Sequence, residues 1–401
     1  MRSGKYVKQT GGFSAFIPAP LPPDPPIYRD SEIDTLLSQA DRNLGRLDGV
    51  TSILPNPDFF VAMYVRYEAV LSSQIEGTQS SLEDVLQFEV GPEGIERPKD
   101  VKEVVNYVRA MNYGLKRLKH FPLSLRLIRE IHAQLLPGTR GSHRTPGEFR
   151  RTQNWIGPAG CTLQNAIFVP PPVPEMHEAL AHLEKFLHDL TPMPVLIRCG
   201  LVHAQFETIH PFLDGNGRVG RLLITFLLCH LQVLQRPLLY LSHYFKMHRA
   251  EYYDRLMAIR QDGHWEGWLK FFLKGVTEVS EDATLTARKI LELREQGRTL
   301  IADRLDSSPA GQRLCDYLFQ QPLVSVSLVQ RHLDCSYVTA NKVVLQFEKL
   351  NLLEETTGWK RNRRYRFKPY LDLFQTEPLT ALPSSNGEKQ TGGKKKEKVH
   401  D

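Results

Sequence analysis

Cysteine is scarce in this sequence and never occurs in closely spaced pairs. Only five cysteines are present in 401 residues, which is an odd number. None of them stands in the Cys-x-x-Cys spacing that many zinc ligands and redox pairs share. A disulfide framework and a zinc site are therefore not indicated, and a reducing cytoplasm fits best.

Long apolar runs are also absent. No stretch of about 18 apolar residues is available to span a membrane, and the basic start at residues 1–5 is not followed by the apolar core of a secretory signal. Apolar residues make up 41% of the chain, an ordinary share for a globular protein. The length suffices for about two or three domains. We expect a cytoplasmic protein with no membrane partner.

The excess of positive charge is concentrated in one segment. The whole chain carries a formal net charge of +6, and the segment between Gly358 and Tyr370 alone contains six basic residues and no acidic one. The remainder of the chain is therefore nearly neutral. A basic segment of this kind suits a nucleic-acid backbone or forms a solvated face. Its six members are Lys360, Arg361, Arg363, Arg364, Arg366 and Lys368.

Residues 209–221 read IHPFLDGNGRVGR and are the most informative part of the chain. The Asp-Gly-Asn-Gly portion is a turn sequence, because glycine and asparagine reach left-handed backbone conformations cheaply. Successive amides in such a turn can bind an anion. Apolar residues then recur at helical spacing, so the turn leads into a helix N-terminus, which also favours phosphate. Arg218 and Arg221 share one face of that first turn and can bind phosphate oxygens.

Two other side chains of this stretch carry chemistry. His210 can accept a proton near neutral pH, and Pro211 ends any helix that arrives from upstream. Asp214 is an oxygen ligand of the kind that holds Mg2+ together with substrate phosphates. A surface turn with a salt-bridged arginine pair is the simpler alternative. The combination nevertheless predicts a polyphosphate site with a base at its edge.

The whole string resembles the signature of the Fic family, His-Pro-Phe-x-(Asp/Glu)-Gly-Asn-Gly-Arg-x-x-Arg, at every specified position. The resemblance implies an all-α fold and the transfer of AMP from ATP to a Tyr, Thr or Ser hydroxyl of a target protein. It makes His210 the catalytic base and Mg2+ on Asp214 the cofactor. For Tyr252, placed by its position after the signature, the alternative is a core position. The residues expected to bind ATP are Asp214, Gly215, Asn216, Gly217, Arg218, Val219, Gly220, Arg221 and Tyr252.

Upstream of the signature, a helical pattern ends in the sequence SSQIEG at residues 72–77. Gly77 is suited to a helix C-cap, and Glu76 lies one turn from Ser72. A glutamate near a helix end is usually just solvated. The segment is similar, however, to the inhibitory motif (Ser/Thr)-x-x-x-Glu-(Gly/Asn) of Fic proteins with an N-terminal inhibitory helix. This similarity implies that Glu76 pairs with Arg221 and keeps it from the γ-phosphate of ATP.

Residues 141–172 are the least helical part of the core. The short run Asn165, Ala166, Ile167 and Phe168 fits the edge of a β-hairpin that could pair with an extended peptide, or a buried loop with a tryptophan anchor. By similarity to the Fic region that clamps the target segment, we assign this run to the target-docking flap.

The pattern changes in residues 307–375. Three short helical patterns are followed by two strand patterns around the basic turn, which resembles a winged helix with Ser336 as the cap of a recognition helix. Residues 336–367 are thus a candidate DNA-binding surface, and a packing or partner module is the alternative. The tail at residues 376–401 has the composition of a disordered segment.

The sequence therefore predicts an all-α Fic core with a short β-hairpin flap and a C-terminal winged helix-turn-helix domain. ATP and an unknown target, the protein itself included, are the expected partners. A homodimer, removal of AMP or another nucleotide donor at the same site, and a DNA-binding regulator that senses nucleotide stay open. The expected parts are a Pro-rich arm (1–28), an N-terminal helical region with the inhibitory motif (29–100), the catalytic core (101–280), a connecting helix (281–306), the winged-helix domain (307–375) and the basic tail (376–401).

Overall fold

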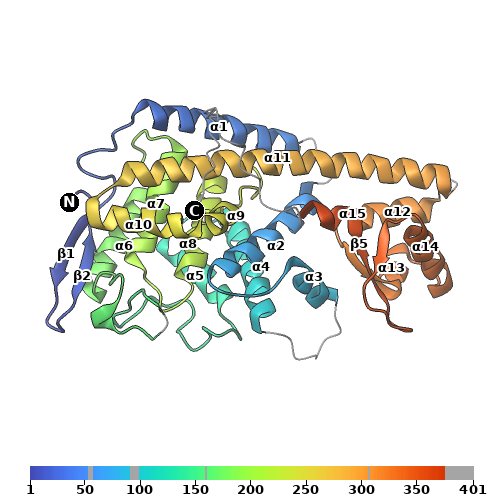
Figure 1. Cartoon of the computed structure of the whole chain (residues 1–401), viewed down its shortest axis with the longest axis horizontal. Coiled ribbons are helices and arrows are strands. Elements are labelled where there is room, and N and C mark those ends of the chain that lie inside the picture. Colours follow the sequence, from blue (N-terminus) through green and yellow to red (C-terminus); the bar gives the residue numbers. More distant parts are fainter. Residues whose placement is uncertain (53–56, 91–98, 159, 306–307, 375–401) are drawn as a thin grey trace, which may run out of the picture.

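Helices dominate the computed structural model, which describes residues 1–52, 57–90, 99–158, 160–305 and 308–374 (Figure 1). The all-α class predicted for the core is confirmed, and the basic tail lies outside the described residues. The helices of the core are α1 (Ser31–Ser52), α2 (Pro57–Ile75), α3 (Leu82–Val90), α4 (Lys99–Leu118), α5 (Leu125–Leu135), α6 (Val173–Leu187), α7 (Val195–Ile209), α8 (Asn216–His230), α9 (Ser242–Met247), α10 (Arg249–Asp262) and α11 (Trp265–Arg304).

The central helix of the core is α7. Every residue from Leu196 to Ile209 is buried, and α6, α8, α10 and α11 all pack against this helix. A helix without a polar face must lie inside the protein, because no side of it can face water favourably. It ends where His210 adopts a left-handed conformation with φ 49° and Pro211 follows. The predicted base thus stands at the end of the most deeply buried helix.

The longest helix, α11, runs without a break from the core toward the C-terminal domain, and α1 lies along it (Figure 1). We expected the core to end at residue 280 and a separate connecting helix to span 281–306. The structure shows one continuous helix instead, because apolar residues keep their helical spacing across the expected boundary. Val276, Val279, Ala283 and Ala287 are all buried.

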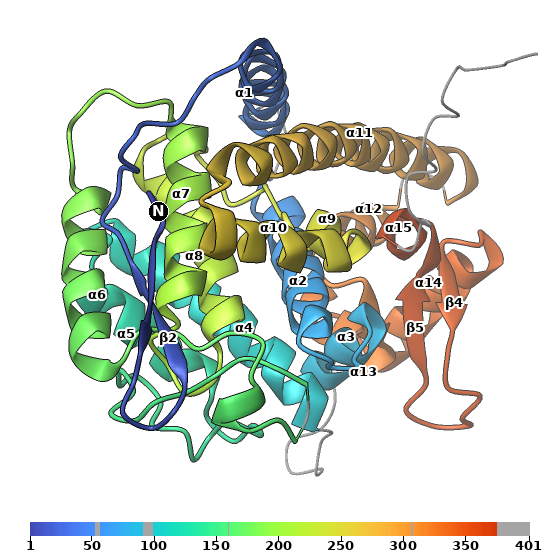
Figure 2. The same ribbon diagram turned by 60° about the vertical axis from the view of Figure 1, so that its left-hand side comes forward.

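The N-terminal arm contains a β-hairpin that the sequence analysis did not predict. Strand β1 (Gly4–Lys8) pairs antiparallel with β2 (Ser14–Pro18), and β2 lies beside α6 and α7 (Figure 2). The Phe16 amide also donates to the Val169 carbonyl at 2.9 Å. The arm thus packs on the body of the protein. The prolines, which suggested a polyproline conformation, mostly follow the hairpin.

The C-terminal domain combines helices with a small antiparallel sheet of strand order β3-β5-β4. The predicted order of three helices followed by a strand pair is confirmed, and Ser336 caps α14 by accepting from the Thr339 amide. Strand β3 was not predicted, and the assignment to the winged-helix class stays a prediction. The elements are α12 (Pro309–Leu318), β3 (Leu323–Ser325), α13 (Val326–Leu333), α14 (Tyr337–Lys349), β4 (Leu353–Glu355), β5 (Arg364–Phe367), α15 (Lys368–Leu371) and the 3-10 helix η2 (Asp372–Phe374).

This domain rests on α2 and α3 of the core. The Phe374 ring lies 5.5 Å from the ring of Tyr64 and 5.9 Å from that of Tyr67, both on α2. Arg366 of β5 forms an ion pair with Glu83 of α3 at 3.8 Å. None of the helices in the described part of the chain combines the length and the apolar character that a membrane span requires.

Candidate active site

The backbone around His210 is held by two side chains that the sequence analysis missed. Arg150 donates from Nε to the His210 carbonyl at 3.1 Å, and Asn154 donates from Nδ2 to the same carbonyl at 3.2 Å. The Arg150 amide also donates to the Pro211 carbonyl at 2.9 Å. A left-handed conformation is costly for a histidine, so it persists only when its surroundings fix it. These bonds supply that constraint.

The His210 imidazole is poised as a neutral base. Its Nδ1 atom is buried without a hydrogen-bond partner among the described residues. Burial and, to a smaller extent, the nearby charges of Arg260 and Arg150 together lower the His210 pKa to about 3, because they disfavour the imidazolium. The ring is therefore uncharged at neutral pH and free to accept a proton.

The glycine-rich turn leads directly into α8, as predicted. Gly215 precedes the helix with φ 79°, a conformation that favours glycine. Asn216 uses both ends of its side-chain amide on the Phe212 backbone, accepting from the amide and donating to the carbonyl at 2.8 Å each. We expected this side chain to bind phosphate. In the structure it shapes the loop through these two bonds, and its contact with phosphate stays a prediction.

A further residue without any signal in the sequence, His132 of α5, secures this turn. It contacts the Asp214 carbonyl through Nε2 at 2.9 Å and accepts from the Gly147 amide at Nδ1, also at 2.9 Å. Because Nδ1 is an acceptor, Nε2 carries the proton and donates to Asp214. The ring stacks on Phe212 at 3.7 Å. Burial lowers the His132 pKa to about 4, so this tautomer stays neutral.

Arg218 is a buried guanidinium with unused donors. One Nη donates to Asp214 at 3.0 Å, and the other lies 3.7 Å from Glu103 of α4. Its Nε and Nη1 atoms are buried and have no hydrogen-bond partner in the described structure. Buried donors of this kind are rare and call for an explanation. A phosphate bound at the start of α8 would satisfy them.

Asp214 fits the expected role in Mg2+ binding only together with a substrate. Its side chain is 38% exposed and accepts one bond from Arg218. No group of three or more His, Cys, Asp or Glu residues suited to a metal occurs in the described parts of the chain. A single carboxylate that opens toward a phosphate site is what Mg2+ uses when phosphate oxygens and water complete its shell.

Arg221 is paired with the predicted inhibitory segment. Its guanidinium donates to the Ser72 hydroxyl at 2.8 Å, to the Ser72 carbonyl at 3.0 Å and to Glu76 at 2.7 Å. Burial raises the Glu76 pKa, but the charge and hydrogen bond of Arg221 outweigh it and bring the pKa below its usual value. A Cβ on Gly217 would lie 2.3 Å from the Glu76 carboxylate. The carboxylate thus lies against the N-terminus of α8, where we expected phosphate. Gly77 ends the segment with φ 93°.

Three residues assigned to ATP binding have other surroundings. Val219 is fully buried in the apolar core, and the Gly220 carbonyl is bonded to His203 at 2.9 Å. Tyr252 is 1% exposed, and its hydroxyl is bonded to the same histidine at 2.9 Å. Helical spacing turns these positions inward, and their contact with ATP stays a prediction. The neighbouring Tyr253 is 40% exposed and lies within electrostatic reach of Glu76 and Arg221.

The predicted flap is an exposed loop tied down at one end. Asn165 and Ile167 are exposed, whereas Phe168 is buried and forms an antiparallel bridge with Ile156. The guanidinium of Arg260 lies 4.0 Å from the Phe168 ring. Of the two expected forms, the hairpin edge is closer to the observed one, because Trp155 is 42% exposed and does not anchor a buried loop. The role of Asn165, Ala166, Ile167 and Phe168 in docking a target stays a prediction.

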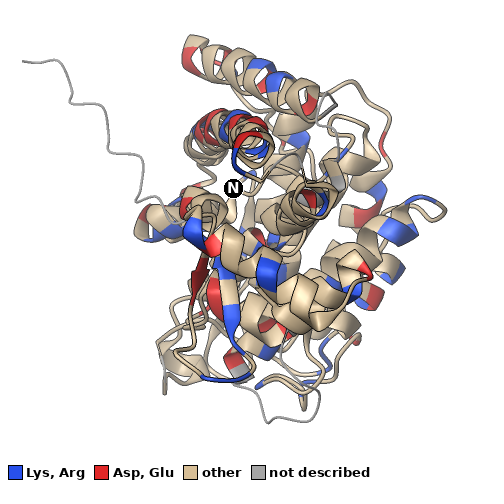
Figure 3. Cartoon of the chain, turned by 90° about the vertical axis from the view of Figure 1, so that its right-hand side faces the viewer, with Lys and Arg blue, Asp and Glu red and all other residues tan. Residues whose placement is uncertain are grey.

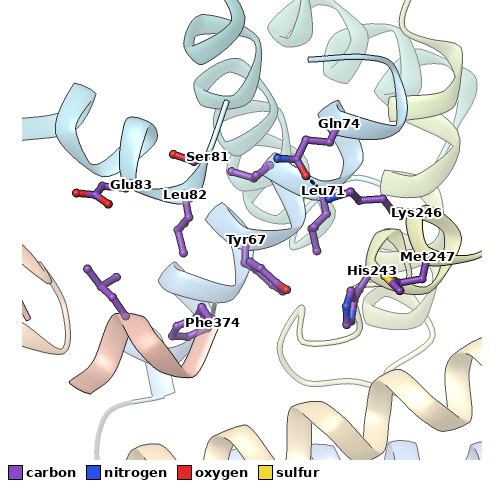
Figure 4. Close-up of a pocket in the computed structure, with 12 residues that line it drawn as sticks. Tyr67, Leu71, Gln74, Ser81, Leu82, Glu83, His243, Lys246, Met247 and Phe374 are labelled. Atoms are coloured by element: carbon purple, nitrogen blue, oxygen red, sulfur yellow. Dashed lines mark hydrogen bonds between the residues drawn. The ribbon is translucent and has the colours of Figure 1, made fainter. Parts of the chain in front are cut away.

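A pocket of about 330 Å3 lies away from this loop, where the C-terminal domain meets the core (Figure 4). None of the residues that line it belongs to segment 209–221. The side chain of Gln74, which accepts from Lys246 at 2.6 Å and donates to the Ser80 carbonyl at 2.9 Å, crosses its edge. Its walls come from α2, α3, α9, α15 and η2, with Tyr67, Leu71, Leu82, His243, Met247 and Phe374 among them.

The helical core brings a histidine, a glycine-rich turn at a helix N-terminus and two arginines together, an arrangement suited to binding phosphate. The model of the Fic/DOC family N-terminal region matches residues 35–116, and the Fic/DOC family model matches residues 122–228. These two stretches of the chain belong to the Fic/DOC family. The predicted family is thereby confirmed.

Curated relatives and a solved structure agree with this assignment. The chain is 29% identical over 218 residues to a protein adenylyltransferase Fic of Aedes aegypti and 28% identical over 230 residues to one of Drosophila melanogaster. These matches cover 52% and 56% of this chain, which spans only 38% and 41% of the respective relatives. A Fic family protein from Desulfovibrio desulfuricans has the same fold, with a TM-score of 0.56 and 20% identity over 86% of this chain and 98% of its own.

Proposed function

We propose that the protein transfers AMP from ATP to a Tyr, Thr or Ser hydroxyl of a target protein. The observation that carries this proposal is the convergence, at the N-terminus of α8, of a neutral buried histidine, unpaired donors of Arg218 and the amides of a glycine turn. Curated relatives named protein adenylyltransferase support it. This arrangement supplies a base and an anion site, which are the two requirements of such a transfer.

In this reaction His210 takes the proton of the target hydroxyl while the oxygen attacks the α-phosphorus. The new P–O bond replaces the bond to pyrophosphate, which leaves. Arg218 and the amides of Gly215 and Gly217 hold the phosphates and offset the developing charge. The anionic phosphates would also raise the His210 pKa toward neutrality, which suits a general base.

Asp214 is the residue that would hold Mg2+, and the ion would supply positive charge next to the phosphates. This role is testable without reference to the ion's geometry. An Asp214→Asn variant keeps the bond to Arg218 but loses the charge, so we expect it to require a higher Mg2+ concentration for the same rate. An unchanged Mg2+ dependence would contradict the assignment.

Glu76 would restrain this activity by holding Arg221. The carboxylate and the γ-phosphate compete for one guanidinium, and the carboxylate has the advantage of being attached to the protein. ATP could still bind, but in a position unsuited to attack on its α-phosphorus.

The transfer is tested with ATP labelled at the α-phosphate and, in parallel, at the γ-phosphate. A Glu76→Gly variant incubated with a cell lysate should acquire label on protein from the α-position only. The double variant Glu76→Gly/His210→Ala should lose at least about 100-fold in rate, since general-base catalysis contributes that much. Label from the γ-position would indicate transfer of the terminal phosphate of ATP in place of AMP. Release of AMP from protein that already carries it would indicate that the enzyme removes the modification. No label despite ATP binding would contradict the proposal.

A second candidate function, nucleic-acid binding by residues 336–367, is favoured by the surface of the C-terminal domain. Tyr337 and Val338 at the start of α14 are 52% and 78% exposed, and Trp359 of the basic turn is 54% exposed. The domain carries charges of both signs (Figure 3). Glu354 forms ion pairs with Arg366 and Lys368. The other four cations, Lys360, Arg361, Arg363 and Arg364, form no ion pair within the described residues.

Anisotropy of a labelled DNA duplex tests this candidate. At about 50 mM salt, where phosphate contacts are strong, binding should weaken in Arg363→Ala/Arg364→Ala. Lys368→Ala is the matched control, because its charge is already paired with Glu354. Absence of binding by the wild-type protein, or equal effects of the two changes, would count against nucleic-acid recognition.

A further inference from the structure

Three polar side chains recur every four residues along α2 and just beyond its end. Glu68 and Ser72 lie on one face of the helix, and Glu76 directly follows its last residue, Ile75. Ser72 and Glu76 bind Arg221, whereas Glu68 has no place in the inhibitory motif and is only 2% exposed. A carboxyl group is rarely buried to this degree without a function or a full set of partners.

The partners of Glu68 satisfy only one of its two oxygens. Oε1 accepts from the Tyr107 hydroxyl of α4 at 3.0 Å and also from the Ser242 hydroxyl of α9. Oε2 is buried and has no partner in the described structure. The carboxyl group is thus fixed by two donors and can hold a proton on its free oxygen.

Hydrogen bonds connect Glu68 to the guanidinium that the inhibitory helix holds. Arg221 donates from Nε to the Ser72 hydroxyl at 2.8 Å. The hydroxyl of Ser72 also lies in hydrogen-bonding reach of Tyr107, whose own hydroxyl donates to Glu68. A Ser72 hydroxyl turned toward Tyr107 would complete a series of donors that runs from Arg221 to Glu68. Such a chain strengthens when its last acceptor is ionised.

We propose that Glu68 is a positioning residue of the inhibited state: it orients Ser72 as an acceptor for Arg221, and its ionisation tightens the hold of α2 on that arginine. Its effect on activity rests on the proposed AMP transfer. Its effect on Arg221 does not, because the arginine can be probed by nucleotide binding alone.

The protonation of Glu68 changes in the neutral range. Burial raises its pKa to about 7, against the opposing effects of the Ser242 hydrogen bond, the Arg221 charge and the Tyr107 hydroxyl. Tyr240 is the other titratable group that faces it. Below this pKa the carboxyl is neutral and the chain is weaker. Above it the carboxylate attracts Arg221, so inhibition should increase as the pH rises.

Glu68→Gln tests the proposal, since glutamine copies the neutral form. We would measure the ratio of the initial AMP-transfer rate of this variant to that of the wild type, from about pH 6 to about pH 8.5. The pH dependence of His210 cancels in the ratio. We expect a ratio near one at the acid end and an increase to about threefold to tenfold at the alkaline end. A ratio that is the same at every pH would mean a merely structural role and would overturn the proposal.

A binding measurement separates this proposal from the proposed function. The affinity of ATP relative to ADP, measured by calorimetry, reports whether Arg221 is available to the γ-phosphate. Glu76→Gly should raise this ratio, and Glu68→Gln should raise it at the alkaline end only. If Glu76→Gly transfers no AMP, the transfer proposal fails while the affinity ratio still decides on Glu68.

Tyr107→Phe keeps the test valid if Glu68→Gln folds poorly. It cuts the chain but leaves the carboxyl in place, so it should raise the ATP over ADP affinity ratio. The variant also removes a donor to the Glu68 carboxylate, which raises the Glu68 pKa. The pH at which the affinity ratio is half-way through its change should therefore be higher than in the wild type. An unchanged ratio and midpoint would overturn the proposal.

Discussion

At the scale of single residues, the His210 ring combines a fixed backbone with an unprotonated side chain. We predict that, in the ligand-free protein, the ring nitrogens keep the NMR shifts of neutral imidazole as the pH falls to about 5. The reason is that burial brings the His210 pKa to about 3. A titration near the ordinary value of about 6.5 would contradict the buried position and the influence of Arg260 and Arg150.

Arg150 offers a second prediction at this scale. Its guanidinium donates to three carbonyls, those of His210, Thr152 and Pro171, and the side chain is 1% exposed. Arg150→Met keeps much of the volume but leaves these acceptors unsatisfied. We expect a loss of about 2 to 4 kcal/mol in the free energy of unfolding by urea. Arg151→Met is the control, because Arg151 is the next residue in the chain and its side chain is 85% exposed. Similar losses in both variants would exclude a specific role for Arg150.

The residues that sequence reasoning found and missed differ in a physical way. His210, Arg218, Arg221 and Glu76 belong to short local patterns, and their chemistry can be inferred from residue type and spacing. Arg150, Asn154, His132 and Glu68 reach the site from distant segments through tertiary packing. No local spacing indicates such contacts. The same limit explains Tyr252 and Val219, whose orientation depends on which helical face is buried. Glu103, which lies 3.7 Å from Arg218, also comes from a distant helix.

At the scale of elements, α7 and α8 approach each other through a glycine. A Cβ on Gly220 would lie 2.3 Å from the Glu207 carboxylate and 3.4 Å from His203. Gly220→Ala should therefore separate the helices locally and lower the free energy of unfolding by about 1 to 3 kcal/mol. Gly45→Ala in α1 is the matched control, since nothing lies within 4 Å of its added Cβ.

The control should show the opposite sign. An alanine in an exposed helix interior stabilises by about 0.5 to 1 kcal/mol relative to glycine. Urea denaturation of both variants measures the two changes in the free energy of unfolding. Equal behaviour of the two substitutions would contradict the close packing of α7 on α8.

The elements themselves were predictable to an unequal degree. The core helices have long apolar periodicities, which is why their existence followed from the sequence. The hairpin of β1 and β2 escaped prediction because its strands are only five residues each and a proline-rich run follows them. Strand β3 has three residues and pairs with β5, which lies about 40 positions later in the chain, so no local signal marks it.

At the scale of the whole molecule, buried titratable groups link stability to pH with opposing signs. The pKa values of His132, His203 and His210 are lowered to about 4, 3 and 3, so the unfolded chain binds three more protons than the folded one below about pH 6.5. The pKa values of Glu68 and Glu207 are raised to about 7, so the folded protein binds two more protons between about pH 7 and 4.5. The difference for these five groups, three minus two, is one proton, and the lowered pKa values of His230, His243 and His332 add to it in the same direction.

This balance predicts the shape of the stability curve. As the pH falls from about 6.5 to about 4.5, the free energy of unfolding should fall by at least about 1.4 kcal/mol per pH unit, the value for one proton. Below about pH 4.5, Glu68 and Glu207 are protonated in both the folded and the unfolded protein. They then no longer offset the histidines, so the free energy of unfolding should fall more steeply with pH. Urea denaturation over this range provides the measurement. Stability that increases as the pH falls to about 4 would contradict the neutral burial of the three histidines.

The central claim is that the Glu76 carboxylate, directly after α2, withholds Arg221 from the nucleotide. The most direct measurement compares the initial rates of AMP incorporation by wild type, Glu76→Gly and Glu76→Gly/Arg221→Ala at saturating ATP and Mg2+. We predict that Glu76→Gly exceeds the wild type by at least about tenfold, the equivalent of about 1.4 kcal/mol for the released ion pair, and that the double variant loses this gain. Equal rates in wild type and Glu76→Gly, with both proteins folded and active, would contradict the account.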